Sequence, residues 1–119
     1  MKRLILSLIS TCLLLISNIS YAAENTGFRK ILDVGCHLHD GTCFVVVDGA
    51  AIGGSYGCSS TQIRWDANTS AMGKHHLSMM LATMKASGLA SFNIDSCYKQ
   101  QAADGSTPWP TFSYAHYKN

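Results

Sequence analysis

The chain carries few charged residues, and its acidic side chains are almost all aspartates. Charged residues make up 13% of the 119 residues, and Glu24 is the sole glutamate. A two-carboxylate glycosidase would therefore have to take its acid and base from aspartates in loops. None of the contexts that activate a serine nucleophile surrounds Ser59, Ser60, Ser78 or Ser87. These absences predict that the protein is not an enzyme and that it needs no cofactor.

Long apolar runs are missing beyond the start of the chain. Lys2 and Arg3 precede an apolar stretch over residues 4–16, and small residues follow up to Ala22. This order is typical of a secretory signal peptide, and the run is shorter than the roughly 20 apolar residues of a membrane span. We therefore predict a signal peptide at 1–22 and no stable membrane anchor. The rest, 23–119, is long enough for one domain and is expected in the periplasm or outside the cell.

No basic patch is present for a nucleic acid. Two of the nine basic residues lie in the leader, so seven remain against seven acidic ones. These seven are scattered along the chain, whereas a groove that follows phosphates needs clustered Lys and Arg. Nucleic acid is therefore not an expected partner.

Cysteines are sparse but even in number once the leader and its one cysteine are removed. The remaining four are Cys36, Cys43, Cys58 and Cys97. In an oxidising compartment this pattern predicts two structural disulfides. An Asp-Gly turn at 40–41 would bring Cys36 opposite Cys43. Cys58 would then pair with Cys97. The rival pairing joins Cys43 to Cys58 and Cys36 to Cys97, and the sequence favours the first only slightly.

The first half of the mature chain has the residue pattern of strands. Alternating apolar and polar residues predict a strand at 31–39, and a β-branched run predicts another at 43–47, joined as a hairpin by the turn. The small, glycine-rich segment 48–55 indicates a loop or a weak, bent strand. A third strand is expected around 56–65.

The second half predicts one helix and two more strands. Possible N-cap residues precede 71–87 and Gly88 follows it, which favours a helix. Its apolar face is expected to hold Leu77, Met80, Leu81 and Met84. Strands are predicted at 92–97 and 111–117. The resulting β-β-β-α-β-β order is mainly β with one helix and predicts a small OB-like barrel. The alternative is an open antiparallel sheet with one packed helix, an α+β arrangement.

Residues 43–95 carry a resemblance to a known family. A cysteine opens the apolar strand at Cys43, and a second, Cys58, follows a small-residue hairpin with Trp65 shortly after it. An amphipathic helix then ends in Ser87-Gly88, before a strand at 92–94. This layout resembles the OB-fold B subunits of pertussis-type and subtilase-type AB5 toxins, and short secreted bacterial proteins of the same layout. The resemblance implies a ring-forming, glycan-binding module. No run of this chain matches a sialic-acid pocket, so no binding residue is carried over.

Two histidines are candidates for a metal site. His37 and His39 stand two apart on the predicted strand, hence on one face, and could begin a site with Asp40. Spacing fixes no third ligand, so the simpler interpretation is a solvated strand face, and no metal is expected. His75 and His76 are adjacent on the predicted helix and point about 100° apart. One of them is expected to border the core and the other to face water.

The candidate binding residues are aromatic, because aromatic rings bury a large area at little entropic cost. They are Trp109, Tyr56 and Tyr98. Trp65 is expected in the core, and Trp109 in a polar loop on the surface. Met72 and Met79 lie off the centre of the apolar helix face and could mark a subunit contact in a homo-oligomer. We therefore predict a secreted or periplasmic, non-enzymatic module that binds a glycan or an exported protein. The alternative is a small monomeric inhibitor or envelope protein acting on another exported protein.

Overall fold

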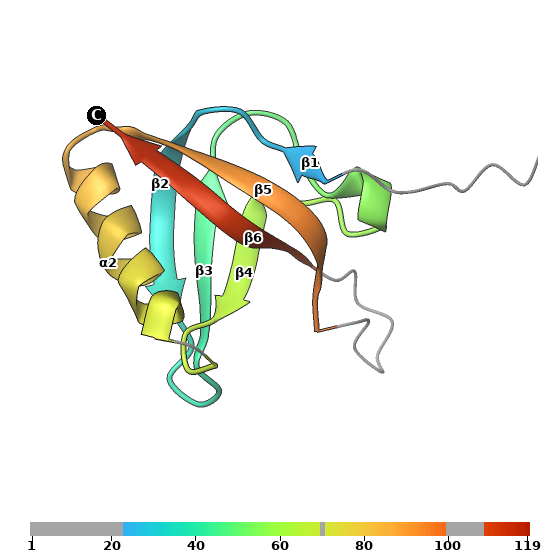
Figure 1. The fold of residues 1–119 in the computed structure, drawn as a ribbon, viewed down its shortest axis with the longest axis horizontal. Coiled ribbons are helices and arrows are strands. Elements are labelled where there is room, and N and C mark those ends of the chain that lie inside the picture. Colours follow the sequence, from blue (N-terminus) through green and yellow to red (C-terminus); the bar gives the residue numbers. More distant parts are fainter. Residues whose placement is uncertain (1–22, 70, 100–108) are drawn as a thin grey trace, which may run out of the picture.

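The computed structural model describes residues 23–69, 71–99 and 109–119. The expected leader at 1–22 lies outside them, as do residues 100–108 of the polar loop before the last strand. The described residues form strands, one α-helix and one short 3-10 helix (Figure 1). In chain order the elements are β1 (Glu24–Asn25), β2 (Arg29–Cys36), β3 (Thr42–Val47), η2 (Gly54–Tyr56), β4 (Gln62–Asp66), α2 (Ala71–Lys85), β5 (Leu89–Tyr98) and β6 (Trp109–Lys118).

All strand pairs of the sheet are antiparallel. β2 pairs with β3, and β3 pairs with β4. β5 pairs with β2 and β1 at successive stretches, and with β6 along its length. Figure 1 shows β5 and β6 lying across β2, β3 and β4, so that the sheet curls over itself. The fold is thus mainly β with one helix.

The curled sheet does not close into a barrel. β4 and β6 are its end strands, and within the described residues no backbone ladder joins them. Side chains fill the seam instead: the Arg64 guanidinium carbon lies 3.4 Å from the centre of the Trp109 ring. A closed barrel would instead need a backbone ladder between these two strands, about 4.8 Å apart. The expected OB-like barrel is therefore wrong, and the alternative, an open antiparallel sheet with one packed helix, is confirmed.

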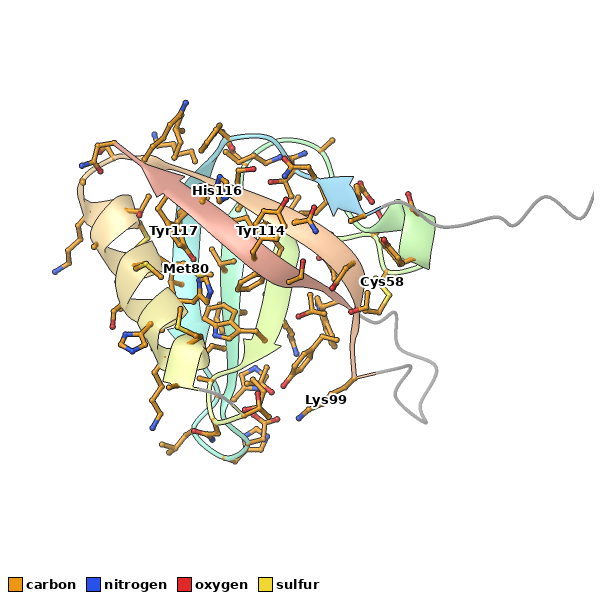
Figure 2. All side chains as sticks on the ribbon, in the orientation of Figure 1. Cys58, Met80, Lys99, Tyr114, His116 and Tyr117 are labelled. Atoms are coloured by element: carbon orange, nitrogen blue, oxygen red, sulfur yellow. A yellow bond between two sulfur atoms is a disulfide. The ribbon has the colours of Figure 1, made fainter. Side chains whose placement is uncertain are left out.

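Helix α2 packs against β2, β5 and β6 through one face. Gly73, Met80 and Thr83 are buried, and Leu77 and Met84 are partly buried beside the core. Figure 2 shows Met80 on the side of the helix that faces the sheet. Leu81, expected on this face, is 37% exposed. The reason is helical geometry, because Leu81 lies one position, about 100°, beyond the buried Met80.

The core lies inside the curl of the sheet. Most of its fully buried side chains come from β3, β4, β5 and α2, and among the largest are Val45, Val47, Ile63, Met80, Phe92 and Ile94. Trp65 is 6% exposed, which confirms the prediction that it belongs to the core.

The segment expected to begin the third strand is a turn. Gly53 and Gly57 flank η2 with φ values of 88° and 79°, a left-handed conformation that favours glycine and breaks an extended chain. The strand therefore starts only at Gln62. The first predicted strand likewise ends at Cys36 rather than at residue 39, and the strand after the helix starts at Leu89 rather than at 92.

Two disulfides join the cysteines in the pairing that the sequence slightly favours. Cys36 is bonded to Cys43, its direct partner across the β2–β3 hairpin. Cys58 is bonded to Cys97 near the end of β5; Figure 2 labels Cys58 in this bond. One bond therefore closes a tight turn, and the other ties the η2 region to the long strand β5. Two disulfides indicate an oxidising environment.

The two disulfides should differ in their contribution to stability. They span sequence separations of 7 and 39 residues, and stabilisation grows with the length of the closed loop. Replacing Cys58 and Cys97 together by serine is expected to lower the free energy of unfolding by about 4 kcal/mol. The same change at Cys36 and Cys43 should cost about 2 kcal/mol. Urea unfolding of the two double variants measures both losses, and a larger loss for the short loop would contradict this expectation.

Candidate functional site

A cleft of about 310 Å³ opens between the end of β4, the start of β6 and the first turns of α2. It lies between the two end strands of the sheet, where side chains rather than a backbone ladder occupy the seam. The lining residues are Trp65, Asp66, Thr69, Met72, Gly73, His76, Tyr98, Thr111 and Phe112. The cleft therefore combines aromatic walls with a carboxylate, two threonine hydroxyls and an imidazole.

The aromatic wall of the cleft is held by packing and by a hydrogen bond. Trp65 donates its indole N–H to the carbonyl oxygen of Gly73 at 2.9 Å. Its ring meets Phe112 edge-on, with ring centres 5.7 Å apart. A Cβ at position 73 would lie 2.8 Å from the carbonyl oxygen of Asp66, so the helix approaches β4 this closely only because residue 73 is glycine. The wall is consequently rigid without a ligand.

The polar edge of the cleft is shaped by the turn after β4. Asp66 accepts the backbone N–H of Asn68 through Oδ1 at 2.8 Å, and the Thr69 hydroxyl donates to the Asp66 carbonyl oxygen at 3.1 Å. A carboxylate has about four lone-pair positions, so this bond leaves acceptor capacity for a ligand. On the opposite side the Tyr98 hydroxyl lies 2.8 Å from Oγ1 of Thr42. Asp66 and Tyr98 are thus both oriented by the protein itself.

His76 reaches the cleft from α2 with one ring nitrogen engaged. Its Nδ1 lies 2.8 Å from the hydroxyl oxygen of Tyr117, and its ring packs edge-on against Phe112. Burial raises the pKa of Tyr117 well above its usual value, so the hydroxyl keeps its proton. Burial, with a smaller contribution from the charge of His75, lowers the pKa of His76 below its usual value. Because His75 is exposed, the prediction that one of these histidines borders the core and the other faces water is confirmed.

The side-chain ammonium group of Lys99 lies beside Tyr98. The Lys99 Nζ lies 5.2 Å from the centre of the Tyr98 ring; Figure 2 shows this lysine at the end of β5. A hydrogen bond to Tyr98 raises the pKa of Lys99, with smaller contributions from the charges of Asp40 and Asp66. Lys99 is therefore a cation at neutral pH.

The three aromatic binding candidates have separate positions. Tyr98 lines the cleft. Trp109 pairs with Tyr98 across the β5–β6 ladder, but it is the first residue of a strand rather than part of a loop, and it is half-buried beneath Arg64. Tyr56 lies in η2, packs against the core and contacts Cys97 through its carbonyl oxygen, so it is outside the cleft.

The two histidines expected on a strand face lie in a turn instead. β2 ends at Cys36, and the chain folds back through residues 37–41, which brings His37 and His39 next to Asp40. The reason is the Asp40-Gly41 turn, since Gly41 adopts a φ of 70°. The three side chains therefore form a cluster separate from the cleft residues.

The segment around η2 carries a sequence pattern typical of serine hydrolases. Residues 53–57 read Gly-Gly-Ser-Tyr-Gly, which matches the Gly-x-Ser-x-Gly pattern of hydrolases. That motif activates its serine at a sharp turn between a strand and a helix. Ser55 lies instead in the 3-10 turn η2, where an isolated bridge between Ile52 and Ser60 closes the segment. The residues of the motif are therefore present, but they do not lie in the turn between a strand and a helix that activates the serine.

Most lining residues of the cleft carry no signal in the sequence. Asp66 and Thr69 appear only as possible caps of the helix, and Thr111 and Phe112 only as strand residues. They meet because β4 and β6 approach one another. Comparison with protein-family models, with curated proteins and with solved structures finds no match for this chain.

Acidification should destabilise the fold through His76. Its folded-state pKa lies below the ordinary value of 6.5, so below that pH the unfolded chain binds more protons than the folded one. The contribution of neutral His76 to stability is complete above its unfolded-state pKa. It is lost progressively as the pH drops from there toward its folded-state pKa. Urea unfolding between about pH 7.5 and about pH 5 should show a smaller loss for His76→Gln than for the wild type. His75→Gln is the matched control and should follow the wild type; equal losses in all three proteins would exclude His76.

Proposed function

We propose that this protein is an exported, non-enzymatic binding module and that the cleft between β4, β6 and α2 holds a sugar residue of a glycan. The observation that carries this proposal is the composition of the cleft. Trp65, Tyr98 and Phe112 form aromatic walls, while Asp66 and Thr111 supply polar groups at the edge. A sugar ring presents apolar C–H faces and hydroxyl groups, so it fits aromatic rings and carboxylate acceptors at the same time.

The size and rigidity of the cleft support a small polar ligand. Its volume of about 310 Å³ lies at the lower end of the range of about 300 to 1,000 Å³ typical of small-molecule sites. The hydrogen bond between Trp65 and Gly73 holds the wall in place. A preformed wall lowers the entropic cost of binding, which matters for a ligand with few contacts.

The number of carboxylates that line the cleft favours binding over hydrolysis. Among the described residues that line it, Asp66 is the single carboxylate. A two-carboxylate glycosidase needs a second carboxyl group on the other side of the scissile bond. We therefore propose recognition without cleavage.

Two observations bear on where the protein works. The disulfides favour export, and the leader at 1–22 would direct it. No helix within 23–69, 71–99 and 109–119 is long and apolar enough to cross a membrane. We propose the periplasm or the cell exterior as the location, where glycans of the cell surface or of a host are accessible.

The Asp66 carboxylate is expected to be the main polar contact with the ligand. A glycan array probed with the labelled, oxidised protein should give binding, and Asp66→Asn should weaken it about tenfold or more, since a hydrogen bond to a charged group contributes about 1.5 to 3 kcal/mol. Asp33→Asn removes the same charge from an exposed position on β2, away from the cleft, and should leave binding unchanged.

The controls separate this function from its alternative. Equal loss in the Asp66 and Asp33 variants would show that net charge, and not the cleft, governs binding. No retained glycan, together with capture of one specific exported protein, would overturn glycan recognition in favour of a small inhibitor or envelope protein.

The proposal includes a homo-oligomer assembled through α2. Met72 and Met79 are 55% and 37% exposed and stand seven positions apart, hence on one side of the helix. Light scattering is expected to give a multiple of the single-chain mass, and Met79→Glu should reduce it. Leu81→Glu changes an equally exposed residue on another side of α2 and should leave the mass unchanged. A single-chain mass for the wild type would exclude the homo-oligomer. It would not bear on the proposal that the cleft binds a sugar.

A further inference from the structure

The turn between β2 and β3 is unusually well restrained for an exposed loop. The Cys36–Cys43 disulfide closes its base, and the His37 backbone N–H donates to the Thr42 carbonyl oxygen at 2.7 Å. The Gly41 carbonyl oxygen accepts the Ala67 N–H at 3.1 Å, which ties the tip to the chain after β4. Gly41 adopts a φ of 70°, a left-handed conformation that favours glycine at this position. The side chains on this turn are therefore presented by a rigid backbone.

Three potential metal ligands converge on this turn. The Nδ1 of His37 lies 3.5 Å from Oδ1 of Asp40, and the Nε2 of His39 lies 3.6 Å from Oδ2. One nitrogen of each histidine and one carboxylate oxygen all lie within 4.8 Å of one another. In a tetrahedral zinc site with bonds of about 2.0 to 2.1 Å, neighbouring ligand atoms are about 3.4 Å apart. The two histidine-to-aspartate distances are close to this length, and they run to the two different oxygens of the Asp40 carboxylate.

The rotation of one histidine ring would complete the metal-binding geometry. The rings of His37 and His39 are stacked, with centres 5.6 Å apart and planes 9° from parallel, so one ring must turn before both nitrogens point at a common ion. His37 lies beside Phe44, with ring centres 6.2 Å apart. The side chain of His39 is 80% exposed, so its ring can turn away from the stack on His37 without the loss of a buried contact. The adjustment is confined to this one exposed side chain.

The carboxylate is prepared for a cation by its own hydrogen bond. The Thr42 backbone N–H donates to Asp40 Oδ1 at 3.0 Å. This bond holds the Asp40 carboxylate in place at the turn. Outer hydrogen bonds of this kind orient the ligands of metal sites.

We propose that His37, His39 and Asp40 bind one divalent first-row transition-metal ion, such as Zn²⁺ or Cu²⁺, on the disulfide-closed turn. Two imidazoles and one carboxylate are ligands that these ions prefer. The remaining coordination positions would be filled by water. This site shares no ligand residue with the glycan cleft, and either proposal can fail without the other.

Calorimetric titration of the untagged, oxidised protein with a zinc salt tests the site. We expect one Zn²⁺ per chain. Loss of an outer-shell partner alone costs about 10-fold to 100-fold in metal affinity, so His39→Gln and Asp40→Asn, which each remove a ligand, should weaken binding more than tenfold. His75→Gln removes an exposed histidine from α2 and should bind zinc like the wild type.

A spectroscopic readout keeps the test independent of folding. In the copper-loaded protein, electron paramagnetic resonance should show coupling to two imidazole nitrogens, and to one in His39→Gln. The exposed position of His39 should leave the near-ultraviolet circular dichroism of this variant unchanged. Absence of zinc binding by the wild type, equal losses in the His39 and His75 variants, or the same nitrogen coupling in His39→Gln as in the wild type would each overturn the proposal.

Discussion

Contacts between side chains hold the two end strands of this sheet together, in the place where a closed barrel would have backbone hydrogen bonds. Trp65 on β4 meets Phe112 on β6 with ring centres 5.7 Å apart, and the Arg64 guanidinium covers the ring of Trp109. Phe112 also packs against Phe92 in the core and against His76 on α2. The position of the helix, the burial of the core and the existence of the cleft all depend on this aromatic seam. A ladder in the same place would leave no space for a ligand.

A core of this size needs restraints at the segments that it does not cover. The Cys58–Cys97 disulfide ties the η2 region to the end of β5, and the Cys36–Cys43 disulfide closes the hairpin turn. The hairpin turn contributes no side chain to the core, whereas the η2 region packs against it through Tyr56. Covalent closure replaces packing at the turn and adds to it at η2, as is common in small exported domains.

The cleft and the turn between β2 and β3, which carries His37 and His39, are connected through the same strands although their chemistry differs. Thr42 follows the turn and pairs with Asp66 across the β3–β4 ladder, and its hydroxyl lies 2.8 Å from that of Tyr98. The cleft offers aromatic faces and hydroxyl or carboxylate groups, whereas the turn offers two imidazoles and a carboxylate. Rigidity is the property they share, because each rests on backbone restrained by strand pairing or by a disulfide.

Local patterns in the sequence predicted the hairpin and the helix, and they favoured the observed disulfide pairing slightly over its rival. The Asp40-Gly41 turn and the alternation around it act over a few residues, so Cys36 meets Cys43 without help from the rest of the chain. Only the tertiary structure decided the open seam and the cleft. Trp65 and Phe112 are far apart in the sequence, and no local periodicity encodes whether β4 and β6 meet through backbone or through side chains. The contact between these two rings exists only once the folded chain has brought β4 and β6 together, so it cannot be read from either segment alone.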